Sequence, residues 1–357
     1  MGFKCGIVGL PNVGKSTLFN ALTASKNAQA ANFPFCTIDP NIGIVDVPDE
    51  RLDQLSKLSN SKKKIFTNIT FVDIAGLVKG ASKGEGLGNK FLSHIREVDA
   101  IIHLVRCFDS SEITHVNSEI NPLNDLETIK TEILLSDIDI IQKKLEKSKK
   151  KLLSSVEIQV LEKKLESLNK SEENMNSFDE EETKILNQLG LLSIKPKIIV
   201  CNVDEESLSS GNKYTAAVIN KFLNEKVVII CADIEDQIMG LDSEERETFM
   251  RDIGLNKTGL NKLIREGYDL LNLDTYFTSG PEESRAWTVK KNTPAPQAAA
   301  VIHTDFEKNF IRAEAVSCED FIQYGSSEKC KENGKLRIEG KDYIVKDGDV
   351  LFFRVNP

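Results

Sequence analysis

The stretch Gly9-Leu10-Pro11-Asn12-Val13-Gly14-Lys15-Ser16-Thr17 carries the strongest structural signal in this chain. It matches G-x-x-x-x-G-K-[ST], a glycine-rich loop that turns its backbone N–H groups inward around phosphates. The apolar run 6–8 before it predicts a strand, and residues 18–22 after it predict a helix. This is the context that a phosphate-binding loop requires. The sequence therefore predicts a nucleoside triphosphate site.

Residue types within the loop indicate the chemistry. Lys15 is a candidate catalytic residue because its ammonium group can reach the β- and γ-phosphate oxygens. The Ser16 hydroxyl is a candidate ligand of Mg²⁺. The predicted nucleotide-binding residues of the loop are Asn12, Val13, Gly14, Lys15, Ser16 and Thr17.

Length and composition describe a globular protein. The 357 residues are 40% hydrophobic and 28% charged, which is typical of about two or three folded domains. A net charge of −9 argues against wholesale coating of nucleic acid. No run approaches the roughly 18 apolar residues of a membrane span, and the first predicted strand begins almost at once. We expect a cytoplasmic monomer without a secretory signal or a membrane partner.

The seven cysteines form no C-x-x-C pair, which favours neither a zinc site nor a disulfide framework. Four of them lie in or beside apolar strand-like runs, at positions 5, 107, 201 and 231. We therefore interpret the cysteines as small buried side chains in a reducing compartment.

Near-continuous apolar runs alternate with helical patterns. This is typical of parallel strands that helices cover on both faces. Strands are predicted at 42–47, 65–73, 100–107, 198–202 and 227–231. The expected fold class is α/β, a doubly wound P-loop NTPase domain formed by residues 1–121 and 192–277.

Two further regions are predicted from composition. Residues 122–191 repeat apolar side chains at helical spacing among Lys and Glu, which predicts an inserted α-helical hairpin with a polar connector at 171–182. Its charged face is either a solvated helix surface or a docking surface. Residues 278–357 read as a small β-rich domain with hairpin-like turns between 335–338, 343–345 and 350–355.

Residues Phe71–Gly76 form a second predicted nucleotide-binding segment, in which a predicted strand ends at Asp73. Asp73 is a candidate acid for the Mg²⁺ shell, and Gly76 is a candidate catalytic residue that presents its N–H to the γ-phosphate. Thr37, between the first helix and the next strand, is the candidate switch residue and a third metal ligand. An ordinary loop threonine is the alternative.

Leu77 occupies the position where Ras-like enzymes carry the Gln that orients the attacking water. A leucine side chain makes no hydrogen bond, so either hydrolysis is slow or another group contacts the water. His115 is one candidate and His94 another, because a neutral imidazole can orient water near pH 7. A role outside catalysis remains open for both.

The base-recognition segment is altered as well. A guanine-specific site has Asn-Lys-x-Asp here, but this chain has Asn202-Val203-Asp204-Glu205. Val203 replaces the lysine whose side-chain stem would cover the base, and Glu205 carries its carboxylate on a longer side chain than the usual Asp. Both changes disfavour binding of guanine. We expect adenine to be bound by Asn202 and nearby backbone groups, with Val203 and Glu205 beside it. Cys231 and Ala232 are predicted to form the loop on the other side of the base.

These motifs together resemble the YchF family of Obg-related P-loop NTPases, also called Obg-like ATPases. The resemblance covers essentially the whole chain. The segments that carry it are 9–17, 32–37, 73–81 and 202–205. It implies a C-terminal β-grasp-like (TGS) domain, an ATPase that uses Mg²⁺ and tolerates GTP, and binding to ribosomes or ribosomal subunits, with contact to rRNA. It also implies a role in translation and stress.

The resemblance assigns individual residues too. Leu77 matches the family's hydrophobic replacement of Gln, and His115 corresponds to its proposed water-orienting histidine. Asn12 matches an asparagine that helps coordinate K⁺ in related loops, so stimulation by K⁺ is a hypothesis. Two alternatives to a slow ATPase stay open: a nucleotide-gated ribosome- or RNA-binding protein with negligible turnover, and an ordinary GTPase.

Overall fold

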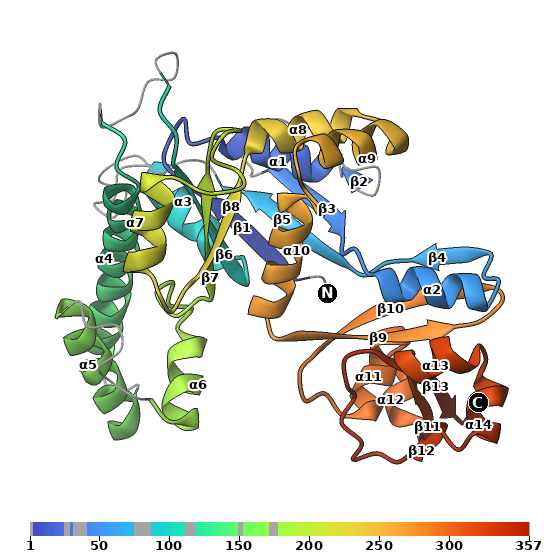
Figure 1. The fold of residues 1–357 in the computed structure, drawn as a ribbon. Coiled ribbons are helices and arrows are strands. Elements are labelled where there is room, and N and C mark those ends of the chain that lie inside the picture. Colours follow the sequence, from blue (N-terminus) through green and yellow to red (C-terminus); the bar gives the residue numbers. More distant parts are fainter. Residues whose placement is uncertain are drawn as a thin grey trace. The chain divides into compact units, whose positions relative to one another are not determined.

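The computed structural model describes residues 3–24, 29–30, 41–74, 87–110, 119–148, 153–170 and 178–356 (Figure 1). Its internal contacts divide the chain into two compact units. The first contains Phe3–Ile44 and Thr70–Leu260, and the second contains Val45–Ile69 and Asn261–Pro357.

A seven-stranded sheet forms the first unit, in the order β2-β3-β5-β1-β6-β7-β8. β1 pairs in parallel with β5 and β6, and the parallel pairing continues through β7 to β8. β2 pairs with β3 in the antiparallel sense. The strands are β1 (Lys4–Val8), β2 (Gln29–Ala30), β3 (Asn41–Asp46), β5 (Asn68–Asp73), β6 (Ala100–Arg106), β7 (Lys197–Asn202) and β8 (Lys226–Ile230). The predicted α/β class is confirmed.

Helices cover this sheet, so its central strands are mostly apolar and mostly buried. All seven residues of β6 are buried. α1 packs against α8, while α4 packs against β6 and α7. The helices of this unit include α1 (Lys15–Ala24), α3 (Leu87–Arg96), α4 (Pro122–Ser148), α7 (Lys213–Lys221), α8 (Ala232–Gly240) and α9 (Ser243–Asp252). α10 (Gly259–Leu270) begins in the first unit, and its residues from Asn261 onward belong to the second.

The inserted region is helical, as predicted, but it contains a third helix. α4 packs against α5 (Ser155–Asn169), which in turn packs against α6 (Glu180–Gln188). α6 begins inside the polar stretch that was expected to be a connector. The reason is a capping box: Asp179 accepts the N–H of Glu182 at 2.8 Å, and the Glu182 carboxylate accepts the N–H of Asp179 at 3.0 Å.

The second unit has its own six-stranded sheet, in the order β12-β11-β13-β9-β10-β4. Its strands are β4 (Lys63–Ile65), β9 (Leu273–Ser279), β10 (Glu283–Lys290), β11 (Phe310–Ser317), β12 (Arg337–Glu339) and β13 (Asp349–Val355). Its helices are α2 (Glu50–Leu58), α11 (Ala295–Ile302), α12 (Asp305–Lys308), α13 (Cys318–Tyr324) and α14 (Ser327–Glu332).

Two strand predictions need correction. The run 65–73 is not one strand: β4 pairs in parallel with β10 of the second sheet, whereas β5 pairs with β1 of the first. The C-terminal strands do not form the expected hairpin, because β12 and β13 both pair with β11. The predicted strand 343–345 is reduced to a single bridge between Ile344 and Pro294.

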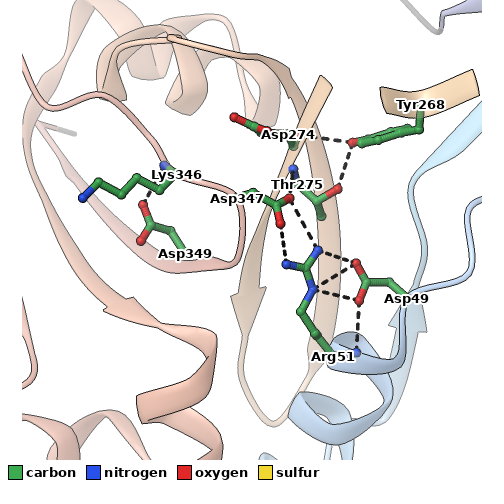
Figure 2. Close-up of polar contacts among 8 residues, drawn as sticks. All are labelled: Asp49, Arg51, Tyr268, Asp274, Thr275, Lys346, Asp347 and Asp349. Atoms are coloured by element: carbon green, nitrogen blue, oxygen red, sulfur yellow. Dashed lines mark hydrogen bonds and ion pairs between the residues drawn. The ribbon is translucent and has the colours of Figure 1, made fainter. Parts of the chain in front are cut away.

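Residues 45–69 are fixed within the second unit by a partly exposed ion-pair cluster (Figure 2). Arg51 binds Asp49 at 2.7 Å and Asp347 at 2.6 Å, and Asp347 accepts the N–H of Thr275 at 2.9 Å. Burial works against the charged guanidinium, but its hydrogen bonds to both carboxylates raise the pKa of Arg51 above its ordinary value. The second compact unit thus contains residues 45–69 together with the C-terminal residues from Asn261 onward. The sequence instead predicted that the C-terminal domain begins at residue 278. The three predicted domain ranges remain a prediction.

Candidate functional site

The loop between β1 and α1 has the backbone that its sequence requires. Asn12 and Gly14 have φ of 62° and 92°, in the left-handed region. A Cβ on Gly14 would lie 2.3 Å from the Asn202 side-chain nitrogen, and a Cβ on Gly9 would lie 2.7 Å from the Leu104 carbonyl oxygen. Both glycines are therefore needed where the loop passes close to neighbouring strands.

Lys15 and Asp73 meet beside this loop. Lys15 Nζ lies 2.6 Å from Asp73 Oδ1, with side-chain exposures of 13% and 10%. The pairing of β1 with β5 sets Ile7 opposite Asp73, which brings the end of β5 to the start of the loop. An ammonium group and a carboxylate thus share one shielded place at the carboxyl edge of a parallel sheet, where such folds bind ligands.

The donor groups here suit Mg²⁺. Asp73 supplies carboxylate oxygens, and Ser16 is an exposed hydroxyl in the first turn of α1. Mg²⁺ in nucleotide sites is bound by one or two protein oxygens, phosphate oxygens and water. Within the described ranges no three His, Cys, Asp or Glu residues gather as a metal cluster. This pattern fits Mg²⁺ carried by a nucleotide better than a metal held by protein groups alone.

Asn202 joins the phosphate loop to the start of α8. Its side chain is buried, its Nδ2 donates to the Val13 carbonyl at 3.0 Å, and its Oδ1 accepts the N–H of Ala232 at 2.9 Å. Both the nitrogen and the oxygen of the side-chain amide therefore hold backbone groups of these two segments in place. The expected contact of Asn202 with the base itself remains a prediction, but the geometry gives the side chain a structural task.

The other base-side residues occupy different environments. Val203 is buried and donates its N–H to Ile230 at 2.8 Å, while Glu205 is exposed. Cys231 is a buried residue at the N-cap of α8, and burial raises the pKa of its thiol. Glu205 is thus the one of these three whose side chain is accessible to a ligand.

Four predicted site residues lie outside the described residues: Thr37, Gly76, Leu77 and His115. His94 lies on α3 and is half-buried, and its Nδ1 has no hydrogen-bond partner in the described part of the chain.

Sequence reasoning did not assign a role to Arg106. Its side chain is fully buried at the end of β6 and donates to the carbonyls of Phe108 at 3.1 Å and Ser110 at 3.3 Å. Tyr214 donates to Asp109 at 2.7 Å, and Asn212 donates to the Cys107 carbonyl at 2.7 Å. These bonds fix residues 107–110 at the carboxyl edge of the sheet. The sequence feature that could have indicated this role is an arginine at the end of a mostly apolar predicted strand.

Within the described ranges, every helix is too short or too polar to cross a membrane.

Comparison with known proteins agrees with the fold. Residues 4–137 match a family model described as 50S ribosome-binding GTPase. Residues 273–356 match a YchF C-terminal model described as a protein of unknown function (DUF933). The solved YchF GTPase of Schizosaccharomyces pombe superposes with a TM-score of 0.87 and 38% identity, covering 99% of this chain and 98% of that one.

Two curated relatives align over their whole length. The ribosome-binding ATPase YchF of Haemophilus influenzae is 51% identical over 364 residues, with 100% of both chains covered. The protein of that name from Bacillus subtilis is 50% identical over 367 residues with the same coverage. Because the similarity runs through the phosphate loop, the helical insertion and the C-terminal unit alike, the chain belongs to the YchF family.

Proposed function

We propose that this protein is a nucleotide-dependent switch that binds ATP in preference to GTP, hydrolyses it slowly with Mg²⁺, and acts on the ribosome in translation and stress regulation. The observation that carries the proposal is the Lys15–Asp73 pair at 2.6 Å beside the phosphate loop, in a chain half identical to proteins named ribosome-binding ATPases.

Catalysis in this site is positioning and charge stabilisation. Backbone N–H groups of 12–17 hold the phosphate chain, and Lys15 places its positive charge on the β- and γ-phosphate oxygens. Ser16, Thr37 and Asp73 would hold Mg²⁺, which would neutralise phosphate charge when bound. Gly76 would donate its N–H to the γ-phosphate.

Slow turnover follows from the residue at 77. Leu77 cannot orient a water molecule, so water positioning falls to His115 in this proposal. The expected consequence is a weak basal rate that a ribosome increases by ordering the site. A protein with negligible turnover, for which ATP is only a regulatory ligand, would show no such increase.

A GTPase is the second candidate, because the S. pombe relative and the N-terminal family model are both named for GTP hydrolysis. Against it stand Val203, buried where a lysine stem would cover guanine, and Glu205, whose longer carboxylate is exposed. ATP and GTP affinities should be measured side by side by calorimetry with Mg²⁺, on the wild type and on Glu205→Asp. Tighter ATP binding supports the proposal, and a gain of GTP affinity in the variant assigns the preference to Glu205. Tighter GTP binding by the wild type would make the protein a GTPase.

Turnover and ribosome binding need separate measurements. Single-turnover hydrolysis of ATP with and without 70S ribosomes tests the switch, with Lys15→Ala as the inactive control. Co-sedimentation with ribosomes in the presence of ATP or ADP tests the partner. Replacing K⁺ by Na⁺ tests K⁺ dependence: Asn12 is exposed in the loop, and equal rates in both salts would remove K⁺ from the proposal.

A further inference from the structure

Lys15 and Asp73 neutralise each other at the place where a nucleotide would need each of them for a different contact. Lys15 Nζ lies 2.6 Å from Asp73 Oδ1, and both side chains are shielded from water, with exposures of 13% and 10%. Phosphate oxygens need the ammonium group, whereas Mg²⁺ needs the carboxylate. The one ion pair therefore engages both of the groups that a Mg²⁺-nucleotide would use.

Asp73 is the fixed partner of this pair. It is the last residue of β5, and the pairing of β5 with β1 sets it opposite Ile7. The next residue, Ile74, donates its N–H to the Ile7 carbonyl at 3.1 Å, so the backbone is held on both sides of the carboxylate. The carboxylate is attached to this backbone through a single methylene group and therefore stays beside the phosphate loop.

Lys15 is the movable partner. It is the first residue of α1, and the N–H of Leu18 donates to the Gly14 carbonyl at 2.9 Å, which holds the backbone at the start of the helix. The ammonium group, in contrast, is at the end of a flexible four-carbon stem. Rotation of this stem can carry the ammonium group from Asp73 to a phosphate while the helix stays in place.

The two positions of the ammonium group differ in electrostatic energy. A phosphate that draws Lys15 away leaves the Asp73 carboxylate without its cation and close to further negative charge. Like charges repel strongly in a place shielded from water. With Mg²⁺, Asp73 exchanges the ammonium group for a divalent cation that carboxylate oxygens bind well. Release of Lys15 is therefore favourable with Mg²⁺ and costly without it.

We infer that Asp73 restrains Lys15, so that the phosphate loop binds a nucleotide tightly only as its Mg²⁺ complex. This inference rests on the proposed nucleotide-binding function and adds a form of regulation to the same site. By reciprocity, a nucleotide that binds through Lys15 also raises the affinity of Asp73 for Mg²⁺. When Mg²⁺ leaves, the carboxylate binds Lys15 again, and the loop weakens its own hold on the nucleotide.

The test compares ATP binding to the full chain by calorimetry in excess Mg²⁺ and in EDTA. Asp73→Asn keeps the shape of the side chain and removes the charge that holds Lys15. In EDTA this variant should bind ATP about tenfold more tightly than the wild type, the usual effect of freeing one charge-assisted hydrogen bond. Asp139→Asn removes an exposed carboxylate from α4 and is the matched control, which should bind as the wild type does. Equal affinities of the wild type and Asp73→Asn in EDTA would overturn the inference.

A double-mutant cycle separates restraint of Lys15 from simple repulsion between Asp73 and the phosphates. Lys15→Met keeps most of the stem and removes the ammonium group. Added to Lys15→Met, the Asp73→Asn change should bring no gain of affinity in EDTA, because no ammonium group remains to be freed. A gain as large as in the wild-type background would mean that the carboxylate repels the phosphates directly, and the inference would be wrong.

Lys15→Met alone provides a second test, which does not depend on the folding of the Asp73 variant. Its loss of ATP affinity should be about tenfold larger in Mg²⁺ than in EDTA, because in EDTA the wild-type ammonium group is already engaged by Asp73. Equal losses in the two conditions would contradict the restraint. A wild type that binds no nucleotide even with Mg²⁺ would instead contradict the proposed function, and the restraint with it.

Discussion

At the residue scale, Asn202 connects two loops through one amide. Asn202→Ala would remove the bonds to Val13 and Ala232 and leave both backbone groups without these partners. We expect the dissociation constants for ATP and GTP to rise together, each by about tenfold or more, because the phosphate loop loses its support. Calorimetry with Mg²⁺ measures both. The exposed Asn187→Ala on α6 is the control and should bind as the wild type does. Loss of ATP affinity alone would instead show that Asn202 contacts the base.

Glu235 of α8 is a second residue whose chemistry can be predicted. It is fully buried, its Oε1 accepts the N–H of Gly259 at 2.6 Å, and its Oε2 has no partner in the described chain. Burial raises the pKa of this carboxyl above its ordinary value, although the backbone bonds oppose the shift. The folded state thus binds the proton more tightly than the unfolded state does. The wild type therefore gains stability from this group as the pH falls through the folded pKa, and loses that contribution as the pH rises.

Glu235→Gln keeps an acceptor for Gly259 and removes the buried charge. We expect the variant to be more stable than the wild type at pH 7.5, with the difference shrinking as the pH falls toward the ordinary range of a carboxyl group. Urea unfolding at pH 7.5 and pH 5 measures this, with exposed Glu247→Gln as the control. A variant less stable at pH 7.5 would mean that the N-terminus of α10 stabilises the charge more than burial penalises it.

At the element scale, α2 belongs to the second unit although it lies in sequence between two strands of the first sheet. Leu52 and Leu55 are fully buried and pack with Phe277, Val316 and Val350. Leu52→Ala should cost about 2–5 kcal/mol. In hydrogen exchange, amides of 45–69 and of β9 and β13 should lose protection together, while those of β1 and β6 keep theirs. Leu58→Ala, at a 38% exposed position of the same helix, should have little effect. Loss of protection in β1 would contradict the assignment.

The same element shows what the sequence can predict. The phosphate loop, β6 and β7 were predictable because their signals are local: a motif with fixed spacing, and apolar runs long enough to span a buried sheet. β4 was not, because it has three residues, of which two are exposed, and its partner β10 lies more than two hundred positions away. The Nε2 atom of His103, which is unpaired among the described residues, could not be predicted either, because in the sequence this histidine looks like any other buried residue of a mostly apolar strand.

At the scale of the whole molecule, the two units have separate sheets and separate cores. The phosphate loop, Asp73 and Asn202 all belong to the first unit. Two thermal transitions are therefore expected in calorimetry of the full chain. A ligand stabilises only the unit that binds it, by about 2.7 kcal/mol at one hundred times its dissociation constant. For a unit of this size that corresponds to a shift of about 5–10 °C.

Mg-ATP at this excess should therefore move one transition and leave the other in place. Lys15→Ala should keep both transitions and lose the shift, because the variant lacks the ammonium group that binds the phosphates. Leu52→Ala should lower the other transition, which assigns the two peaks independently of the nucleotide. If Mg-ATP raised both transitions equally in the wild type, the stabilities of the two units would be coupled. Nucleotide binding would then be energetically coupled to the C-terminal unit, which is the coupling that a ribosome-directed switch needs.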